Sequence, residues 1–362
     1  MALRATSSTF VLTFIIGLVF GAIISGFFFK LQEKTASITQ KGPRKFSVSK
    51  ILDNDPSGHV QVDKTNEVST HESKRFQEHT DVGSYRGEDT VATDVKKKVK
   101  ILIWVATHPD NKETKLKHLK ATWGKRFEPN EIIYISSQDD PDFPIIGLKL
   151  EVPEGRDALW AKTRAAFKYV YDNHFNDADW FMKADDDTYV IAENLRHFLS
   201  DKDPSQPHYF GRRFKPYVRK GYMSGGSGYV ISKEALKRVV TKAFPDSTHC
   251  RGPTHPGAED VEMGKCLDSV GVYAGDSRDS LGRERFHPFV PDQHLTPGTL
   301  PSGFWYWQYI YYKTPQGLEC CSDETITFHY VGPNLMYSLE YMVYHMRPFG
   351  VEQGSCSATQ LA

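Results

Sequence analysis

The chain has 362 residues, 39% of them hydrophobic and 25% charged, which is enough to bury one large core or two modest ones. Its 45 basic and 45 acidic residues balance, so net charge gives no indication of a nucleic-acid or acidic-polymer partner, and we expect no nucleic acid among its partners. The composition otherwise leaves the function open.

The N-terminal region predicts a membrane anchor. Residues 9–29 contain no charged residue, and a helix needs about twenty apolar residues to cross the hydrocarbon core. A cleaved signal peptide is the alternative, but its apolar region is usually shorter and ends in small residues, whereas this run ends in three phenylalanines before Lys30. Arg4 on one side and Lys30 on the other hardly fix the orientation of the span.

A polar segment follows the predicted anchor. Residues 30–95 are rich in Ser, Thr, Lys, Asp and Glu and show no sustained helical or alternating pattern. Such a segment cannot bury enough apolar surface to fold alone, so we predict a stem here. The folded domain is expected to begin near residue 95.

Strand and helix patterns then alternate along the chain. Apolar runs predict strands at residues 100–107, 131–136 and 180–184, and apolar residues at helical spacing predict helices at 112–123 and 157–175. The order strand, helix, strand, helix, strand is typical of an α/β domain with parallel strands.

Three consecutive acids, Asp185 to Asp187, directly follow the predicted strand at 180–184. Three neighbouring carboxylates repel one another, so a cation or a set of donors is needed to stabilise them. Ligands of open α/β sheets gather at the carboxyl ends of strands, and carboxylate oxygens suit Mg²⁺ and Mn²⁺. The acids therefore indicate a metal site, and a solvated acidic turn is the alternative.

The five cysteines all lie in the C-terminal part of the chain, and none forms the CxxC pair typical of a zinc site. A lumenal domain with disulfides is the simpler interpretation, which places residues 1–8 in the cytosol. Cys250 and Cys266 could close a local loop, whereas adjacent Cys320 and Cys321 form either a vicinal bridge or bonds with separate partners. The odd count leaves one thiol unassigned.

Five segments, in order, carry a resemblance to a known family: DWFMKADDDTYV (179–190), FGRRFKPYV (210–218), GYMSGGSGYVISKEAL (221–236), GDSRDSLGRERFHPF (275–289) and FHYV (328–331). The chain resembles the animal core 1 β1,3-galactosyltransferases, the glycoprotein-N-acetylgalactosamine 3-β-galactosyltransferases, over about residues 97–350. The resemblance implies a GT-A glycosyltransferase fold, which is an α/β, Rossmann-like mixed sheet flanked by helices. It implies a catalytic domain at 96–350 and a flexible tail at 351–362.

The resemblance also implies a function. The expected reaction moves galactose, with inversion, from UDP-galactose to O3 of GalNAc linked to Ser or Thr of a glycoprotein, with Mn²⁺ as the cofactor. The protein is then expected in the Golgi membrane as a single-pass type II protein with a lumenal catalytic domain, and a homodimer is expected by resemblance alone. The alternatives are a fringe-like β1,3-N-acetylglucosaminyltransferase, a non-catalytic chaperone-like relative, and a carbohydrate-binding membrane protein without turnover.

The metal ligands are assigned by resemblance. Asp187 is expected to bind the metal directly, and Asp185 to be a further metal ligand or to contact the ribose or a metal-bound water. Asp186 is expected to position the nucleotide-binding loop. His329 completes the metal site through its imidazole, a moderately good ligand for Mn²⁺. The alternative for His329 is a core histidine satisfied by its neighbours.

The reaction also needs a base, because the acceptor hydroxyl loses its proton as it attacks. Glu259 and Asp260 are similar to the acidic pair that supplies the base in the family, and Asp260 is the better match. The alternative is that the pair caps the helix that follows, since acids favour helix N-termini.

The donor side is expected to include four further residues. Gly225 and Gly226 lack the GxGxxG pattern of a dinucleotide site and are expected to form the floor beneath the donor sugar, with a flexible turn as the alternative. Thr107 is expected to border the uracil pocket, and Arg156 to help hold the nucleotide.

The acceptor side is expected to be aromatic. Residues 304–312 hold a run of Trp and Tyr that could stack on sugar faces, and among them we expect Trp305 to contact the acceptor, with ordinary packing as the alternative. Tyr222 is the second acceptor residue implied by the resemblance. The chain departs from the family at Ile103 and Phe127, where core 1 enzymes commonly carry cysteines, so a whole disulfide is expected to be missing.

Overall fold

The computed structural model describes residues 90–150 and 154–349, which belong to one compact unit. The predicted span at 9–29, most of the predicted stem, the tail at 351–362 and Cys356 lie outside the described residues. None of the helices within the described ranges is both long and apolar enough to cross a bilayer. Helix α3 (Thr90–Lys98) takes in the last residues of the segment predicted as stem.

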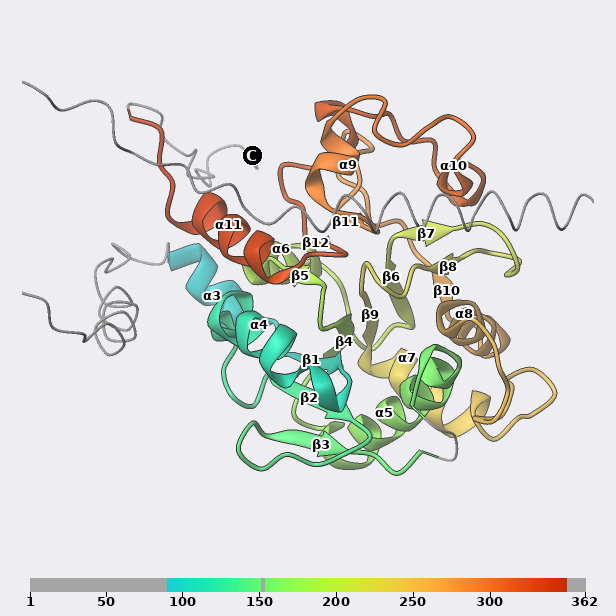
Figure 1. Ribbon diagram of the computed structural model, residues 1–362. Coiled ribbons are helices and arrows are strands. Elements are labelled where there is room, and N and C mark those ends of the chain that lie inside the picture. The colour runs from blue at the N-terminus through green and yellow to red at the C-terminus, as the bar shows by residue number, and fades with distance from the viewer. Residues whose placement is uncertain (1–89, 151–153, 350–362) are drawn as a thin grey trace, which may run out of the picture. The chain divides into compact units, whose positions relative to one another are not determined.

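A seven-stranded sheet runs through the centre of the domain in the order β10-β6-β9-β4-β1-β2-β3 (Figure 1). Strands β1, β2, β3 and β4 are mutually parallel, whereas β9 runs antiparallel to β4 and β6. The prediction of parallel strands is therefore confirmed for β1, β2 and β4, and β9 makes the sheet mixed. The strands are β1 (Ile101–Ala106), β2 (Ile132–Ser136), β3 (Ile145–Gly147), β4 (Trp180–Asp185), β6 (His208–Gly211), β9 (Tyr229–Ser232) and β10 (Tyr273–Ala274).

Helices cover both faces of this sheet. One apolar core contains residues of α4 (Lys117–Ala121), α6 (Ala192–Leu199) and α11 (Pro333–Tyr344), and the other contains residues of α5 (Leu159–His174), α7 (Lys233–Arg238) and α8 (Glu259–Ser269). Helix α5 confirms the prediction at 157–175. The segment predicted as one helix at 112–123 is helical but irregular, since it joins the π-helical turn η2 (Lys112–Leu116) to α4 and the 3-10 turn η3 (Trp123–Arg126).

Strand β1 shows why its sequence is apolar throughout. Ile101, Ile103 and Val105 pack in the first core, while Leu102 and Trp104 pack in the second. Successive side chains of a strand point to opposite faces, so a strand covered on both sides needs apolar residues at every position.

Two small sheets flank the central one and bring distant segments together. β5 (Tyr189–Val190) pairs antiparallel with β12 (Thr327–Phe328), which pairs with β11 (Phe286–His287). The backbone N–H of Val331 also donates to the carbonyl of Asp187, with 2.9 Å between N and O. Residues just after β12 therefore lie beside the acidic turn that precedes β5. β7 (Arg213–Phe214) and β8 (Tyr222–Met223) form a hairpin.

The remaining elements are short. They are α9 (Pro291–Leu295), α10 (Trp305–Tyr309) and the helical turns η1 (Pro109–Asn111), η4 (Arg156–Ala158), η5 (Val239–Ala243) and η6 (Leu318–Cys320).

Two disulfides answer the question that the cysteine spacing left open. Cys250 pairs with Cys266, and Cys320 forms a vicinal bridge with Cys321. Ile103 and Phe127, which stand where the resembling family commonly has cysteines, are both buried in the first apolar core.

Candidate active site

The acidic triplet lies at the carboxyl end of β4, as predicted. Asp185 is the last residue of the strand, and the backbone N–H of Asp186 donates to the carbonyl of Ala106, the last residue of β1. The hydroxyl of Thr188 closes the turn by accepting from the N–H of Asp185. The carboxylates thus lie at the edge of a parallel sheet, where ligands of α/β proteins gather.

His329 joins two of these acids although it comes from the other end of the domain. Its Nε2 lies 3.2 Å from an Asp187 carboxylate oxygen and 4.0 Å from one of Asp185, and the three groups offer ligand atoms within 4.8 Å of one another. Its Nδ1 is 3.3 Å from the carbonyl oxygen of Pro288, a contact that holds the ring so that Nε2 faces the acids. Two carboxylates and an imidazole are a donor set that suits a divalent ion.

Asp187 and Asp186 differ in electrostatics. Burial by itself raises the pKa of Asp187, but the hydrogen bond and charge of His329, with Lys115, outweigh burial and lower it to about 2. Burial raises the pKa of Asp186, and contacts with Lys115 and Asn111 only partly oppose that rise. The Asp186 carboxylate also accepts from Thr107 Oγ1 at 2.9 Å, which ties the acidic turn to the end of β1.

Two lysines supply the positive charge that the acids require, and the sequence analysis identified neither. Lys115 Nζ lies 2.8 Å from Asp186 and 3.3 Å from Asp187. Lys183 is only 4% exposed and lies 2.7 Å from Asp185. Burial lowers the pKa of Lys183, but the carboxylates of Asp185 and Glu259 outweigh burial and raise it, so the ammonium stays charged. The sequence signal that could have identified Lys183 is its place as a charged residue among the apolar residues of the predicted strand.

Gly225 and Gly226 lie against the acidic cluster and have no room for a side chain. A Cβ at Gly226 would lie 2.1 Å from the ring of His329, and one at Gly225 would lie 2.5 Å from a Glu259 oxygen. The carbonyl of Gly226 accepts from the Thr188 hydroxyl at 2.8 Å. Both glycines are therefore needed for close packing, which argues against a merely flexible turn.

Glu259 and Asp260 begin α8 and lie in different surroundings. Glu259 is buried, accepts from the Tyr229 hydroxyl at 2.8 Å and faces Lys183 at 3.7 Å. Asp260 is half-buried and accepts from the N–H groups of Gly225 and Val261. Burial raises the pKa of both acids, against the opposing effect of Lys183 on Glu259 and of the two N–H groups on Asp260. The cap position itself is Ala258, whose side chain makes no capping bond.

The predicted acceptor residues lie in an aromatic region next to His329. Trp305, on α10, is 41% exposed, and its ring centroid is 5.9 Å from that of Phe289, whose ring stacks on Tyr330. Tyr222, on β8, is buried beside Phe214. Trp305 is thus placed at the surface and Tyr222 within the packing, and their contacts with an acceptor stay predictions.

The structure places the two residues predicted to bind the nucleotide in different surroundings. Thr107 is part of the acidic cluster through its bond to Asp186. Arg156, in η4, is exposed, and its side chain forms no hydrogen bond or ion pair with another described residue. Glu154 nearby pairs with Lys162, whose Nζ donates to the carbonyl of Thr107 at 2.8 Å. The structure therefore does not bring Arg156 into the cluster, and its role stays a prediction.

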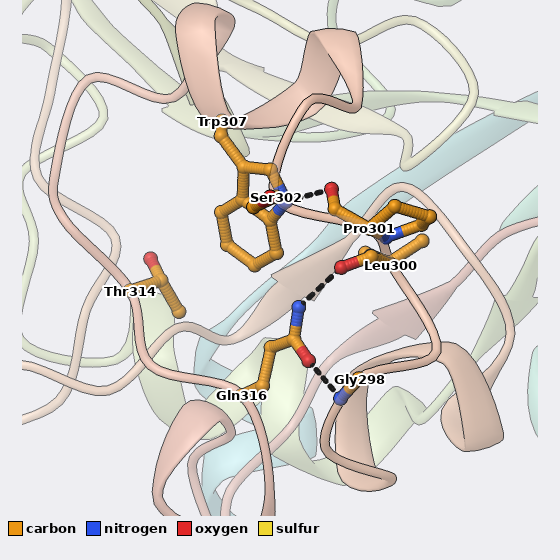
Figure 2. A pocket seen from close by; sticks show the side chains of 7 residues that line it. All are labelled: Gly298, Leu300, Pro301, Ser302, Trp307, Thr314 and Gln316. Carbon is orange, nitrogen blue, oxygen red and sulfur yellow. Dashed lines mark hydrogen bonds between the residues drawn. The ribbon is translucent and has the colours of Figure 1, made fainter.

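A separate open hollow of about 510 Å³ lies in the segment around α10 (Figure 2). The amide of Gln316 bridges its rim by donating to the carbonyl of Leu300 and accepting from the N–H of Gly298, and Trp307 Nε1 donates to the carbonyl of Pro301. The predicted site residues take no part in its lining.

Comparisons with known proteins identify the family to which the chain belongs. The Fringe-like family model matches residues 96–279. Glycoprotein-N-acetylgalactosamine 3-beta-galactosyltransferase 1 of Xenopus laevis is 48% identical over 266 residues, which cover 73% of this chain and 72% of that protein. Beta-1,3-glucosyltransferase of Mus musculus is 28% identical over 49% of this chain and 35% of that protein.

A solved structure is a more distant match. The galactosyltransferase LgtC, in complex with donor and acceptor sugar analogs, aligns with a TM-score of 0.38 at 12% identity, over 69% of this chain and 98% of that one. A TM-score this low does not establish a common fold. The sequence matches do establish the family, and the resemblance predicted from the motifs is confirmed: the chain belongs to the Fringe-like family and, within it, to the glycoprotein-N-acetylgalactosamine 3-β-galactosyltransferases.

Proposed function

We propose that the protein is an inverting β1,3-galactosyltransferase of GT-A fold that moves galactose from UDP-galactose to O3 of GalNAc-α-Ser/Thr on glycoproteins. The proposal rests on one observation. Asp185, Asp187 and His329 converge at one edge of the central sheet, and Gly225 in the adjoining loop binds the carboxylate of Asp260. Family membership supports the same reaction, since the Xenopus laevis relative is a 3-beta-galactosyltransferase that acts on glycoprotein N-acetylgalactosamine.

The residues present fit a divalent metal ion, and we propose Mn²⁺. The carboxylate of Asp187 is ionised at neutral pH, and Nε2 of His329 is oriented toward it by the bond that Nδ1 makes. When bound, the ion would stabilise the negative charge that develops on the departing UDP. Asp185, Asp187 and His329 would hold it.

The chain's own residues would carry out the proton transfer. As the acceptor O3 forms its bond to galactose C1, the bond from C1 to the UDP oxygen breaks, and the O3 proton passes to Asp260. Burial raises the pKa of Asp260, and a carboxylate of higher pKa is a stronger base. Glu259 is less suited to this role, because the hydroxyl of Tyr229 and Lys183 already engage it.

The remaining predicted residues would bind the two substrates. Asp186 and Thr107 hold the acidic turn where the nucleotide is expected. Trp305 offers an exposed indole on which the acceptor sugar can stack.

A panel of donors against acceptors tests the proposed reaction. The protein, or a fragment that begins before Thr90 so that α3 is complete, is incubated with UDP-galactose or UDP-N-acetylglucosamine and with GalNAc-peptide or fucosyl-peptide, with Mn²⁺ present. We expect transfer from UDP-galactose to GalNAc-peptide only. Transfer of N-acetylglucosamine to fucose would favour the fringe-like function, and absence of any UDP release would favour a non-catalytic relative.

We also propose that residues 9–29 anchor the protein in the Golgi membrane with the catalytic domain in the lumen. The uncharged run supports this proposal. Protease added to intact vesicles should leave the domain undigested, and digestion would contradict the orientation.

We also propose that the protein forms a homodimer, and sedimentation of the purified protein tests this oligomeric state.

A further inference from the structure

Lys183 is a buried cation between the proposed metal-binding acids and the proposed base. It lies on the same face of β4 as Phe181, the face that packs toward α5, α7 and α8, and its side chain is 5% exposed. A buried ammonium is costly unless oxygen atoms surround it. Lys183 has three such partners, and each belongs to a different element of the site.

Two of these partners, Asp185 and Gly225, form with Lys183 a continuous chain of contacts from the metal ligands to the base. Lys183 Nζ lies 2.7 Å from a carboxylate oxygen of Asp185 and donates to the carbonyl of Gly225 at 3.0 Å. The N–H of the same Gly225 donates to the Asp260 carboxylate at 3.2 Å. One glycine thus meets the lysine with its carbonyl and the proposed base with its N–H.

Glu259 balances the charge of Lys183 without entering the chain of contacts. Its Oε1 accepts from the Tyr229 hydroxyl in the buried interior, and its Oε2 faces Lys183 at 3.7 Å. A Cβ added at Gly225 would lie 2.5 Å from a Glu259 oxygen, so the glycine backbone packs closely against this carboxylate. Gly225 is therefore confined between Lys183 and Glu259.

We propose that Lys183 is a positioning residue that sets the Asp260 carboxylate relative to the metal-binding acids, and so places the acceptor oxygen relative to the donor sugar. The inference rests on the proposed galactosyl transfer. Reacting groups must be placed within a fraction of an ångström, and a displacement of about 1 Å costs on the order of a hundredfold in rate. Without Lys183, the Gly225 carbonyl loses its hydrogen-bond donor. The backbone of Gly225 can then shift, and its N–H no longer holds the Asp260 carboxylate in place.

The test compares Lys183→Met with Lys168→Met in the full protein. Calorimetric titration with UDP and Mn²⁺ counts the binding-competent sites, and transfer to GalNAc-peptide is then expressed per site. We expect Lys183→Met to lower kcat per site about tenfold to a hundredfold while the Kd for UDP and Mn²⁺ changes much less. Lys168 pairs with Asp172 on the exposed side of α5 and contacts neither Asp185 nor Gly225, so Lys168→Met should leave both the Kd and kcat unchanged.

A second variant separates positioning from charge balance. Lys183→Met with Glu259→Gln removes the buried Glu259 carboxylate that would otherwise lie unpaired near the methionine, and it also serves if the single variant fails to fold. We expect the loss in kcat per site to persist. The proposal is overturned if the double variant regains the wild-type kcat, or if Lys183→Met acts only by weakening Mn²⁺ binding. Absence of transfer by the wild-type protein would instead refute the proposed function.

Discussion

Asp187 has an environment that keeps its carboxylate ionised, because His329 and Lys115 lower its pKa to about 2 despite burial. An ionised carboxylate is the ligand that a divalent cation needs. We expect Asp187→Ala to lower turnover at least about a hundredfold, and EDTA to abolish wild-type activity. Full activity of a folded Asp187→Ala protein in EDTA would show that the metal assignment is wrong.

Asp260 and Glu259 are neighbours with different predicted roles. Asp260→Asn keeps the shape and can hydrogen-bond but cannot accept the O3 proton, so turnover should fall about a hundredfold to ten-thousandfold. Binding of UDP and Mn²⁺, followed by calorimetry, should survive, because the metal ligands lie elsewhere. Glu259→Gln is the matched control and should cost less. A larger loss of turnover in Glu259→Gln than in Asp260→Asn would identify Glu259 as the base.

Gly226 gives a prediction that depends on the space beside His329. A Cβ there would lie 2.1 Å from the imidazole, so Gly226→Ala must displace the ring from the carboxylates. We expect Mn²⁺ affinity, measured by calorimetry, to fall about tenfold to a hundredfold, as when the groups that orient a ligand are lost. Gly252→Ala is the control, since a Cβ there meets no atom within 4 Å. Equal affinities in the two variants would refute the prediction.

At the scale of elements, a buried ion pair joins segments that lie far apart in the sequence. Arg212, after β6, is 1% exposed, pairs with Glu284 at 2.8 Å and also donates to Tyr306 on α10 and to Thr314. Burial raises the pKa of Glu284 even though Arg212 opposes the rise. These contacts fix the aromatic helix α10, which carries Trp305, against the end of the central sheet.

Removing one partner of this pair should cost more than removing both. Arg212→Met leaves the Glu284 carboxylate buried and unpaired, so the free energy of unfolding should fall by about 3–5 kcal/mol, measured by urea denaturation. Arg212→Met with Glu284→Leu should recover much of that loss. Lys168→Met breaks the exposed pair with Asp172 and should cost about 0–1 kcal/mol. A loss in Arg212→Met no larger than this control would contradict the assignment.

At the scale of the whole molecule, two buried histidines couple stability to pH. Burial lowers the pKa of His294 from 6.5 to about 3, and burial lowers that of His287 well below 6.5, with Arg212 contributing in both cases. The rings lie 5.0 Å apart, between α9 and β11. Because both groups stay neutral in the folded state, the unfolded chain binds more protons as pH falls below 6.5.

Stability should therefore decrease as pH falls from 6.5 to about 5.5, by up to about 1.4 kcal/mol per pH unit for each histidine. Below that window, buried acids with raised pKa, such as Glu284, take up protons in the folded state and oppose the trend. His294→Phe places a ring that does not titrate among Phe289 and Tyr306 and should reduce the slope, measured by urea denaturation at several pH values. An unchanged slope would show that His294 does not contribute.

The elements that could be predicted are those whose pattern is local. β1, β2, β4 and α5 follow from apolar runs and helical spacing, and Asp185 to Asp187 follow from their place after a strand. β9 belongs to a glycine-rich motif without a clear strand pattern, so its antiparallel position between β4 and β6 could not be predicted from the sequence. The helix predicted at 112–123 is present, but its irregularity escaped prediction, since the π-helical turn leaves no mark in the periodicity.

The sequence by itself determined the family, through motifs in order, and the chemistry of the site, through its carboxylates and His329. The tertiary structure alone decided which of these groups meet. Pairing of β5 with β12 brings His329 to Asp187, and Gly226 leaves the space for its ring. The charge that stabilises the acids comes from Lys183 within β4 and from Lys115 in the helical turn η2. Such contacts depend on distances between segments remote in sequence, and no local pattern records those distances.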